Sequence, residues 1–336
     1  MRVAIVSSAA LTTPPPFYGG LEMIAFADAV RLSKKHDVVL YAKRGSRAVA
    51  QVFADEYGLD LSFEVAEVFE HSEAPLRVEA DVVIDHSWGK VAASASPSVQ
   101  VFHGVYKTPH DVPKPVGVSK THAEILRSLY GRAWYVYGHT LEEMYRAGDS
   151  DRERLLLFLG RAAREKGLLN FIEACRLLRP EGFRCAFVGD DSADWEYALL
   201  AYSRAREAGV EWLGLQPHDV KASLLRRAYA VVVLPLPPYV EVFGLWALEA
   251  FLSGTPVITT RAGAMAEYVV DGWNGRLTSG DPREVAEAAL AGFRARPHEL
   301  RTYALENFSS EEMARRLVEI ALEEEATGPG ARTPRS

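Results

Sequence analysis

Short apolar runs alternate with helical patterns along most of the chain, and this alternation limits the folds that the sequence can adopt. The runs RVAIV (2–6), DVVLYA (37–42) and DVVIDH (81–86) have the length and residue types of buried strands. Helical patterns or long connections separate many of these runs, which is typical of parallel sheets packed with helices. We therefore predict an α/β protein that is built from doubly wound sheets.

A polar segment, EEMYRAGDSDRER (142–154), interrupts the alternation and is the best candidate for a linker, since a second series of strand and helix patterns follows it. We expect two Rossmann-like domains that face each other across a cleft at the carboxyl ends of their strands. The N-terminal domain would span 1–148 and the C-terminal domain 149–308. A last helix over 309–325 could pack back toward the N-terminal domain, and the tail 326–336 is expected to be disordered.

Composition limits the class of protein. The net charge of −7 over 336 residues argues against a general nucleic-acid-binding protein, which would carry a basic stripe. No stretch approaches the roughly 20 apolar residues that span a bilayer, and the first apolar run is too short for a signal peptide. We therefore expect a cytoplasmic protein. Three asparagines and three glutamines beside many glutamates and arginines fit a thermophilic protein, although a GC-rich genome would produce part of the same bias.

The two cysteines, Cys175 and Cys185, lie in a helical and a strand-like apolar pattern, respectively. Free cysteines in such patterns behave as small buried hydrophobic side chains, and disulfides are rare in the cytoplasm. We therefore expect the two side chains to be unpaired rather than joined in a disulfide bond or a metal site.

The stretch AVVVLPLPPYVEVFGLWALEAFLSGTPVITT (230–260) predicts a buried strand, a proline-rich loop and a helix that begins near Phe243. The first backbone N–H groups of such a helix have no intrahelical partners, and Gly244 would let an anion approach them closely. Two carboxylates flank this position, Glu241 before the turn and Glu249 within the apolar helix. They could face a ligand. Alternatively, Glu241 could complement the helix dipole while Glu249 pairs with an arginine or lysine.

Two cations follow the first strand pattern of the C-terminal unit. Arg161 comes just after the strand in LFLGRAAREKG, and Lys166 precedes the next helix. Arginine as a bidentate donor and lysine as a point charge would together suit a diphosphate. The other interpretation is a solvated surface run that also includes Arg164 and Glu165.

Further strand ends carry residues that could line a crevice. Two strand patterns of the N-terminal unit end in His86 and His103, where a histidine can donate to a ligand oxygen. A structural histidine is the alternative at each position. In the C-terminal unit, Gly189 and Gly214 end strands, so that a ring could lie against the backbone.

Together these motifs resemble those of a known family. Glu241 and Glu249 form an E-x7-E pair in EVFGLWALEA, and the segment SGTPVITTRAGAMAEYVVDGWNGRL follows soon after. With GR…EKG after a strand, YGG near the N-terminus and FHG at a strand end, the chain is similar to family 4 of the GT-B glycosyltransferases, the glycosyl transferases group 1. The resemblance extends over residues 1–325 and is densest from 155 to 280.

The resemblance implies a set of donor-binding residues. Arg161 and Lys166 would bind the diphosphate of a nucleotide sugar, and Glu249 would bind its ribose hydroxyls. Glu241 would bind hydroxyls of the donor sugar, and His103 would line the reaction centre. His103, Glu241, Arg161 and Lys166 are therefore the candidate catalytic residues. The other donor-binding candidates are Gly19, Gly20, Gly189, Leu213, Gly214, Leu215, Val242, Phe243, Gly244 and Leu245.

The acceptor side is less constrained, and Tyr18, His86 and Tyr106 are the candidates for it. Many relatives have an Asn-Gly segment where this chain has YGH (137–139), so no donor contact is assigned to that segment. The acceptor itself is expected to be a molecule with a hydroxyl group, of unknown identity.

The implied reaction is the transfer of a sugar from a nucleotide diphosphate sugar to a hydroxyl acceptor, with retention of the anomeric configuration. Cations and helix N–H groups aimed at the leaving diphosphate stabilise its developing charge, so neither a metal nor another cofactor is expected. The alternatives are a nucleotide-sugar epimerase or sugar phosphorylase on the same scaffold, and a non-catalytic nucleotide-sugar-binding protein. Peripheral membrane contact is not favoured over a solvated helix end, but it would use the basic residues Lys34, Lys35, Lys43, Arg44 and Arg47.

Overall fold

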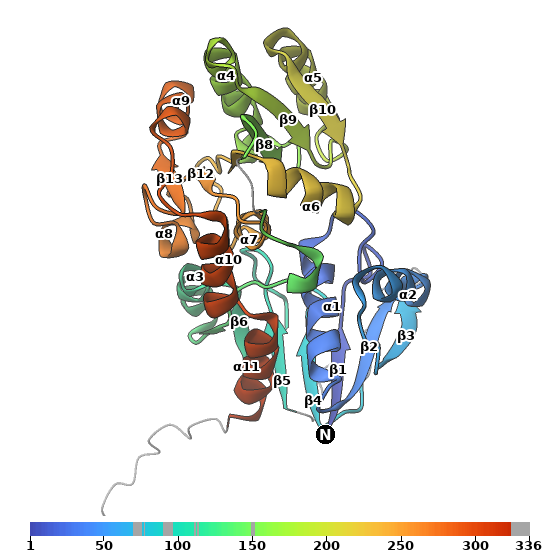
Figure 1. Cartoon of the computed structure of the whole chain (residues 1–336). Coiled ribbons are helices and arrows are strands. Elements are labelled where there is room, and N and C mark those ends of the chain that lie inside the picture. Colours follow the sequence, from blue (N-terminus) through green and yellow to red (C-terminus); the bar gives the residue numbers. More distant parts are fainter. Residues whose placement is uncertain are drawn as a thin grey trace, which may run out of the picture.

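Two parallel β-sheets packed with helices form the core of the protein (Figure 1). The structure is a computed structural model, and it describes residues 1–69, 76, 78–89, 97–110, 112, 114–148 and 152–323. The predicted strands form these sheets because a strand in the middle of a parallel sheet is covered on both faces and is therefore apolar on both. In β8 (Leu155–Leu159), for example, all five side chains are buried.

The N-terminal sheet has seven parallel strands in the order β3-β2-β1-β4-β5-β6-β7. Its first connection runs from β1 through α1 to β2, as in a Rossmann fold. The elements of this unit are β1 (Arg2–Val6), α1 (Gly20–Leu32), β2 (Asp37–Lys43), α2 (Ser46–Tyr57), β3 (Glu64–Phe69), β4 (Val82–Asp85), β5 (Ser98–Val101), β6 (Pro115–Gly117), α3 (Lys120–Tyr130) and β7 (Trp134–Tyr135).

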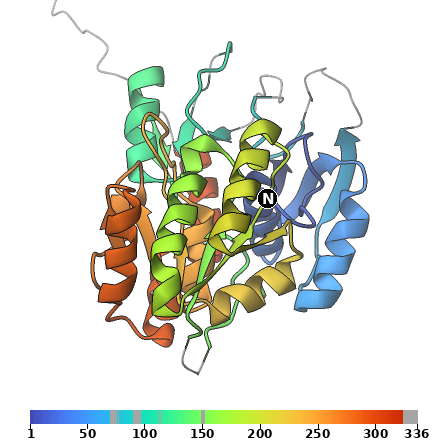
Figure 2. The ribbon, with the colours of Figure 1, turned by 90° about the horizontal axis from the view of Figure 1, so that it is seen from above.

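The C-terminal sheet has six parallel strands in the order β10-β9-β8-β11-β12-β13. Helices α4 and α5 lie side by side over it (Figures 1 and 2). The elements that follow β8 are η2 (Arg164–Lys166), α4 (Leu168–Leu178), η3 (Arg179–Glu181), β9 (Arg184–Val188), α5 (Trp195–Ala208), β10 (Val210–Gly214), α6 (His218–Arg227), β11 (Ala230–Val232), α7 (Leu245–Leu252), β12 (Val257–Thr260), α8 (Met265–Tyr268), β13 (Gly275–Thr278), α9 (Pro282–Ala291) and α10 (Pro297–Asn307).

Both sheets repeat one topology. In each, the chain moves outward over three strands and then returns to the other side of the first strand, so that the order reverses between β1 and β4 and between β8 and β11. Ligands of such sheets bind outside the carboxyl ends of the strands at this reversal. The prediction of an α/β protein with two Rossmann-like sheets is confirmed, and the topology gives each sheet one expected binding edge.

The C-terminal helix, α11 (Ser310–Leu322), packs against α1 and against β4 and β5 of the N-terminal sheet. Its first turn is tied to η1 (Glu142–Met144), because the backbone N–H of Ser310 donates to Glu142 at 2.6 Å. The predicted tail, 326–336, lies outside the described residues. The division of the chain at residue 148 stays a prediction.

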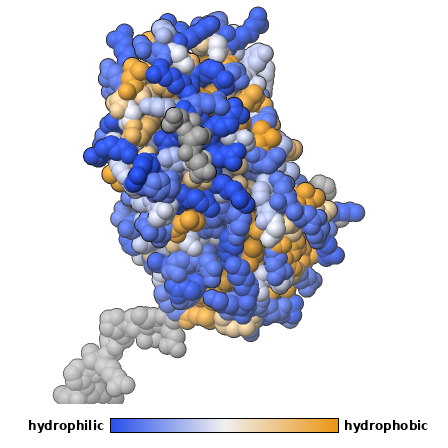
Figure 3. All heavy atoms as spheres, in the orientation of Figure 1, coloured by the Kyte–Doolittle hydropathy of each residue, from blue (hydrophilic) through white to orange (hydrophobic). Residues whose placement is uncertain are grey.

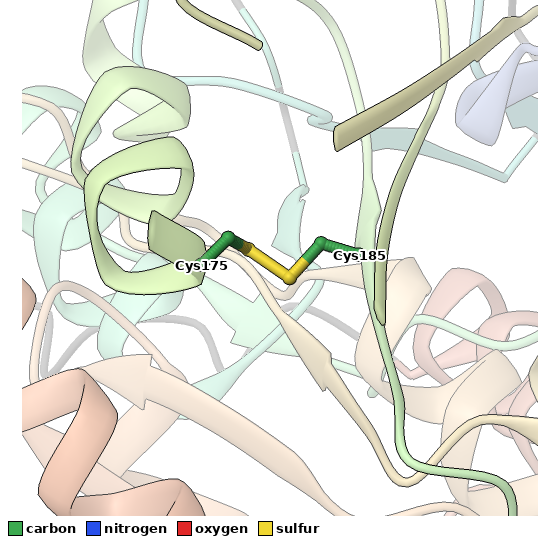
Figure 4. The surroundings of a disulfide bond; sticks show 2 residues. All are labelled: Cys175 and Cys185. Atoms are coloured by element: carbon green, nitrogen blue, oxygen red, sulfur yellow. A yellow bond between two sulfur atoms is a disulfide. The ribbon is translucent and has the colours of Figure 1, made fainter. Parts of the chain in front are cut away.

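Cys175 and Cys185 are joined by a disulfide bond (Figure 4). The prediction that they are unpaired is therefore wrong. Cys175 lies on α4 and Cys185 on β9, and the short connection through η3 returns the chain so that their Cα atoms are 6.2 Å apart. That distance suits a disulfide. The apolar patterns indicated correctly that both side chains are buried, but a pattern does not show that two buried side chains face each other.

Replacing both cysteines by alanine is expected to lower the free energy of unfolding by about 2–3 kcal/mol, because the unfolded chain regains the freedom of a short closed loop. Urea denaturation of the double variant and of the oxidised wild type measures the difference. Wild type treated with a reductant serves as the control and should match the variant. Equal midpoints for oxidised and reduced wild type would contradict the prediction.

Helix α1 and three of the basic residues after it have contacts within the protein. This helix is buried along nearly its whole length, and Lys34 and Lys35 at its end lie 3.9 and 3.7 Å from Glu311. Lys43 donates to the carbonyl of Ala10 at 2.8 Å. The face in Figure 3 is largely hydrophilic, with scattered hydrophobic residues. Within the described residues, no helix has the length and apolar character needed to cross a bilayer.

Candidate active site

A cavity of about 450 Å³ lies between the two units, at the carboxyl ends of strands from both sheets. The N-terminal unit contributes the loop after β1, the start of α1, Trp88 and His103, and the C-terminal unit contributes strand ends and the start of α7. Motifs from both halves of the sequence therefore meet in one place. The predicted site residues that line the cavity are Tyr18, Gly19, Gly20, His103, Arg161, Lys166, Gly189, Leu215, Glu241, Val242, Phe243, Gly244, Leu245 and Glu249.

Two of the predicted acceptor residues lie behind the cavity wall. His86 is fully buried, and its Nδ1 is 2.9 Å from Nε2 of His103, which does line the cavity. Tyr106 stacks on Trp88 with ring centroids 4.7 Å apart, and Trp88 is the ring that lines the cavity. In both cases the residue that lines the cavity is a neighbour of the predicted one. The position of a residue in the sequence does not show which of two neighbouring rings reaches the cavity.

The donor-binding candidates at the end of β10 reach the cavity only in part. Leu213 and Gly214 belong to β10 and do not line the cavity, whereas Leu215 and Gln216 do. On the neighbouring strand, Gly189 lies where a Cβ atom would be 1.7 Å from the carbonyl oxygen of Gly160. Only glycine fits there, so the backbones of the two strand ends approach closely at this side of the cavity.

Glu241 and Lys166 form a buried ion pair in the cavity wall, with Lys166 Nζ 2.6 Å from Glu241 Oε2. The same ammonium donates to Tyr239 Oη at 3.0 Å, and Trp246 Nε1 donates to Glu241 Oε2 at 3.4 Å. Burial alone would lower the pKa of Lys166, but the charge of Glu241 and the Tyr239 hydroxyl outweigh it and raise that pKa. Lys166 is therefore positively charged at neutral pH, and its partners balance the cost of burying the charge.

Arg161 lies beside this pair, directly after β8. Its guanidinium donates to Glu165 at 3.0 Å, and a third of its side chain is exposed. Arg164, in contrast, points to solvent and lies 3.7 Å from Asp194. The interpretation as a solvated surface run therefore holds for Arg164, whereas Arg161 and Lys166 line the cavity.

Glu249 is held by two side chains that the sequence did not single out. Tyr145 Oη donates to Glu249 Oε1 at 2.8 Å, and Lys221 Nζ donates to the same oxygen at 2.7 Å. The alternative that Glu249 pairs with a lysine is thus correct, and Glu249 also lines the cavity. A signal for Lys221 was present, because it lies four residues before buried Leu225 on the inner face of α6. Tyr145 lies in the segment that we interpreted as a linker.

The helix of the E-x7-E segment begins two residues later than predicted. Gly244 is its N-cap, with φ of 81°, and α7 starts at Leu245. The backbone conformation favours glycine, and a Cβ atom at Gly244 would in addition lie 2.6 Å from Met265 Cε and displace that side chain. The first N–H groups of α7, from Leu245 and Trp246, have no intrahelical acceptor and lie at the cavity.

Glu22 is a further cavity residue that the sequence did not reveal. It lies in the first turn of α1, is buried, and accepts a hydrogen bond from the Ser8 hydroxyl. An acidic residue at that position complements the helix dipole in many proteins, so the pattern gave no reason to assign it to a site. Across the described residues there is no cluster of three or more histidine, cysteine or acidic side chains arranged to hold a metal ion.

Comparisons with known proteins show which family domain the chain resembles. Residues 142–304 match the family model for glycosyl transferases group 1. A glycogen synthase of Mycobacterium tuberculosis is 37% identical over 139 residues, which cover 40% of this chain and 32% of that protein. A D-inositol 3-phosphate glycosyltransferase of Pseudarthrobacter chlorophenolicus is 34% identical over 130 residues, which cover 37% of this chain and 30% of that protein. The chain thus matches about a third of the length of these curated relatives.

Solved structures extend the likeness over nearly the whole chain. AviGT4, a glycosyltransferase involved in avilamycin A biosynthesis, has a TM-score of 0.73 and 23% identity, and the match covers 96% of this chain and 97% of that one. Anabaena Alr3699/HepE in complex with UDP-glucose has a TM-score of 0.71 and 16% identity, with coverage of 95% and 98%. At such identities, the likeness establishes the fold. The chain therefore has the GT-B fold, and its residues 142–304 match the domain of the glycosyl transferases group 1.

Proposed function

We propose that the protein is a retaining, metal-independent glycosyltransferase that moves a sugar from a nucleoside diphosphate sugar to a hydroxyl group of an acceptor. One observation carries the proposal. Two buried carboxylate–lysine pairs, Glu241 with Lys166 and Glu249 with Lys221, converge on one cavity beside Arg161. A ligand that combines a diphosphate with two sets of vicinal hydroxyls fits this mixture of fixed cations and carboxylates.

The diphosphate is assigned to the positive side of the cavity. Arg161 and Lys166 border it, and the first N–H groups of α7 lie at the same cavity. Cleavage of the sugar–phosphate bond places negative charge on the leaving diphosphate, and cations and N–H groups that are already in place stabilise that charge. Gly19, the N-cap of α1, and Gly20, its first residue, also line the cavity, and in this proposal they leave room for the phosphates.

The two glutamates are assigned to hydroxyl groups. Tyr145 and Lys221 both donate to Oε1 of Glu249, and in the described part of the chain no residue donates to its Oε2. Lys166 and Trp246 likewise both donate to Oε2 of Glu241, and no described residue donates to its Oε1. Each glutamate thus has one oxygen that holds it in place and one that can accept from hydroxyls. We assign Glu249 to the ribose and Glu241 to the donor sugar.

The remaining walls are assigned to the base and the acceptor. The nucleobase would lie against Gly189 and beside Leu215 and Gln216. The acceptor would enter past Tyr18 and the exposed ring of Trp88, on the N-terminal unit. The solved complexes of Anabaena Alr3699/HepE with UDP-glucose and of TarM with UDP support a nucleotide sugar as the donor class. In this proposal, residues 1–148 form the acceptor domain and 149–308 the donor domain.

Nucleoside diphosphates and their sugars are expected to raise the melting temperature of the protein. A ligand at 100 times its Kd adds about 2.7 kcal/mol to the free energy of unfolding. A thermal-shift comparison of UDP, GDP, ADP and their glucose or mannose derivatives therefore identifies the base. Glu249→Gln should abolish most of the gain, because it removes the carboxylate assigned to the ribose, while EDTA should leave the gain unchanged.

Incubation with the preferred nucleotide sugar then separates the proposed reaction from the alternatives. A transferase consumes the donor rapidly only with a hydroxyl acceptor, an epimerase converts it without one, and a phosphorylase requires phosphate. If no nucleoside diphosphate or nucleotide sugar changed the melting temperature, the proposed function would be wrong.

A further inference from the structure

A chain of four buried or half-buried side chains leads from His103 into the N-terminal unit. Nε2 of His103 is 2.9 Å from Nδ1 of His86. Nε2 of His86 is 3.1 Å from Oδ2 of Asp28, and Oδ1 of Asp28 is 2.9 Å from Nε2 of His139. Asp28, His86 and His139 are fully buried. The four residues come from α1, from the ends of β4 and β5, and from the segment after β7. The fold therefore brings residues that are distant in the sequence together beside the cavity.

His139 is at the inner end of this chain, and its surroundings require it to carry a proton on each ring nitrogen. Its Nε2 faces the carboxylate of Asp28, and its Nδ1 is 3.1 Å from the carbonyl oxygen of Tyr137. Both neighbours are acceptors, and only an imidazolium donates from both nitrogens. Burial lowers the pKa of His139, but the charge of Asp28 outweighs burial and raises it, and the two histidines correspondingly lower the pKa of Asp28 against the effect of its burial.

The protons on the outer two histidines follow from this charge pair. Nε2 of His86 lies 3.1 Å from Oδ2 of Asp28 without the alignment of a hydrogen bond. A carboxylate oxygen at that distance still favours a proton on the nitrogen that faces it, so we assign a proton to Nε2 of His86. The single carboxylate already pairs with the imidazolium of His139, and His86 turns Nε2 toward the same carboxylate, so we assign Nδ1 of His86 as the acceptor for His103. His103 must then donate from Nε2, which leaves its Nδ1 without a proton. Burial and the neighbouring histidines hold the pKa of His103 well below its usual value, so it stays neutral.

A fourth histidine fixes the backbone next to His103. Nδ1 of His122 accepts from the N–H of Val118 at 3.2 Å, and its Nε2 donates to the carbonyl of Gly104 at 3.1 Å. Burial lowers the pKa of His122 to about 4, so it is neutral as well. The other titratable group nearby, Asp85, is held by Ser87, whose N–H donates to it at 2.7 Å. Glu142 is a further charged group near the chain, and its charge also raises the pKa of His139, in the same direction as Asp28.

We propose that Asp28, His86 and His139 are positioning residues that hold the proton of His103 on Nε2. The unprotonated Nδ1 of His103 then faces the cavity, where it accepts a hydrogen bond from a sugar hydroxyl group. Nδ1 of His103 has no hydrogen-bond partner among the residues that the structure describes, and His103 lines the cavity. The identity of the ligand rests on the proposed function, whereas the proton arrangement does not. A bare nitrogen accepts from a hydroxyl and repels a phosphate or carbonyl oxygen, so this tautomer would place a sugar rather than the diphosphate beside His103.

Long-range ¹H–¹⁵N correlation spectra of the protein labelled at histidine test the proton arrangement without any substrate. The expected spectrum at pH 7.5 has two protonated nitrogens for His139, and a protonated Nε2 with an unprotonated Nδ1 for His103. Signals are assigned with His103→Gln and His139→Gln. A protonated Nδ1 on His103, or a neutral His139, would overturn the proposal, and neither result depends on whether the protein is a transferase.

Two variants test the coupling along the chain. In His139→Gln, His86 becomes the only histidine beside Asp28 and is expected to take the second proton, so that it donates to His103 and moves the proton of His103 to Nδ1. In Asp28→Asn, His139 and His86 lose their carboxylate, and His103 should show both tautomers. Asp55→Asn, at an exposed position of α2, is the matched control. An unchanged His103 spectrum in His139→Gln or Asp28→Asn would contradict the proposal, and if one variant does not fold, the other remains decisive.

Titration of the labelled protein with nucleotides identifies the molecule whose hydroxyl group donates to His103. If a nucleotide sugar shifts the Nδ1 signal of His103 and the nucleoside diphosphate does not, the hydroxyl belongs to the donor sugar. If neither shifts it while both bind, the hydroxyl belongs to the acceptor. In addition, Asp28→Asn should lower the turnover number about tenfold, which is the value of one hydrogen bond, and leave the Kd of the nucleoside diphosphate unchanged. Failure of every nucleotide to bind would refute the proposed function but leave the proton arrangement measurable.

Discussion

Lys166→Ala is expected to lower kcat/KM for sugar transfer by roughly 10²–10³-fold, which is the usual effect of removing one group that stabilises charge in the transition state. The ammonium is buried, and its raised pKa keeps it charged at neutral pH. It also holds Glu241 at 2.6 Å, so the variant loses both the cation that we assign to the diphosphate and the group that orients the carboxylate that we assign to the donor sugar. The rate of transfer with the preferred nucleotide sugar, measured under kcat/KM conditions, gives the effect directly.

The same substitution destabilises the fold, so the two effects must be separated. Removal of one partner of a buried ion pair typically costs about 3–5 kcal/mol, because the other charge is left unpaired. A group with a raised folded-state pKa stabilises the protein below its unfolded pKa, which is about 10.4 for lysine, and that contribution is lost only as the pH rises through the folded value. The pair therefore contributes fully at neutral pH, and the assay must be performed well below the melting temperature of the variant.

Arg164→Ala is the matched control for Lys166→Ala. Arg164 lies two residues away on the same short helix, but it is exposed and its nearest carboxylate, Asp194, is 3.7 Å away. Its removal should change the melting temperature little and leave kcat/KM within about twofold, since exposed pairs contribute about 0–1 kcal/mol. If Lys166→Ala transferred sugar as fast as Arg164→Ala, the assignment of the diphosphate to this side of the cavity would be wrong.

The parts of the site that were predictable from the sequence are those whose residue types are unusual for their position. Glu249 lies in an apolar helix, and Arg161 and Lys166 follow a buried strand, so each required either a partner or a ligand. The fold was predictable for a related reason, because parallel strands are apolar on both faces and helices separate them. These patterns involve residues that are close together in the sequence, so they can be recognised without knowledge of the folded structure.

The parts that were not predictable depend on which segments meet in space. Lys221 and Tyr145 come from α6 and from the segment between the sheets, and only the folded chain brings them to Glu249. The disulfide likewise depends on the turn between α4 and β9. His86 was predicted to face an acceptor because it ends a strand, but the His103 ring at the end of the next strand lies in front of it. Contacts between segments that are distant in the sequence produce no periodic pattern from which they could be predicted.

Arg31→Ala is expected to lower the free energy of unfolding by about 3 kcal/mol, the lower end of the range for breaking a buried charge network. The guanidinium of Arg31 donates to Ser310 Oγ at 2.6 Å, to Glu142 at 2.6 Å and to both oxygens of Glu143 at 2.6 and 2.7 Å. It thereby joins α1, η1 and α11. The side chain of Glu142 is only 14% exposed and would lose its main counter-charge, whereas Glu143 is 40% exposed and water can solvate it, which is why the lower value is expected.

Arg315→Ala on α11 is the matched control, because Arg315 also pairs with two glutamates, Glu312 and Glu319, but does so on the surface. Its loss should cost less than about 1 kcal/mol. Urea denaturation compares the two variants, and amide hydrogen exchange shows where the structure opens. In Arg31→Ala, exchange in α11 should accelerate before that of the sheet that it covers, because the helix loses its anchor to η1 while its apolar contacts with β4 and β5 remain. Equal stability of the two variants would mean that apolar packing alone holds α11, and that the charge network contributes nothing to joining the end of the chain to the N-terminal unit.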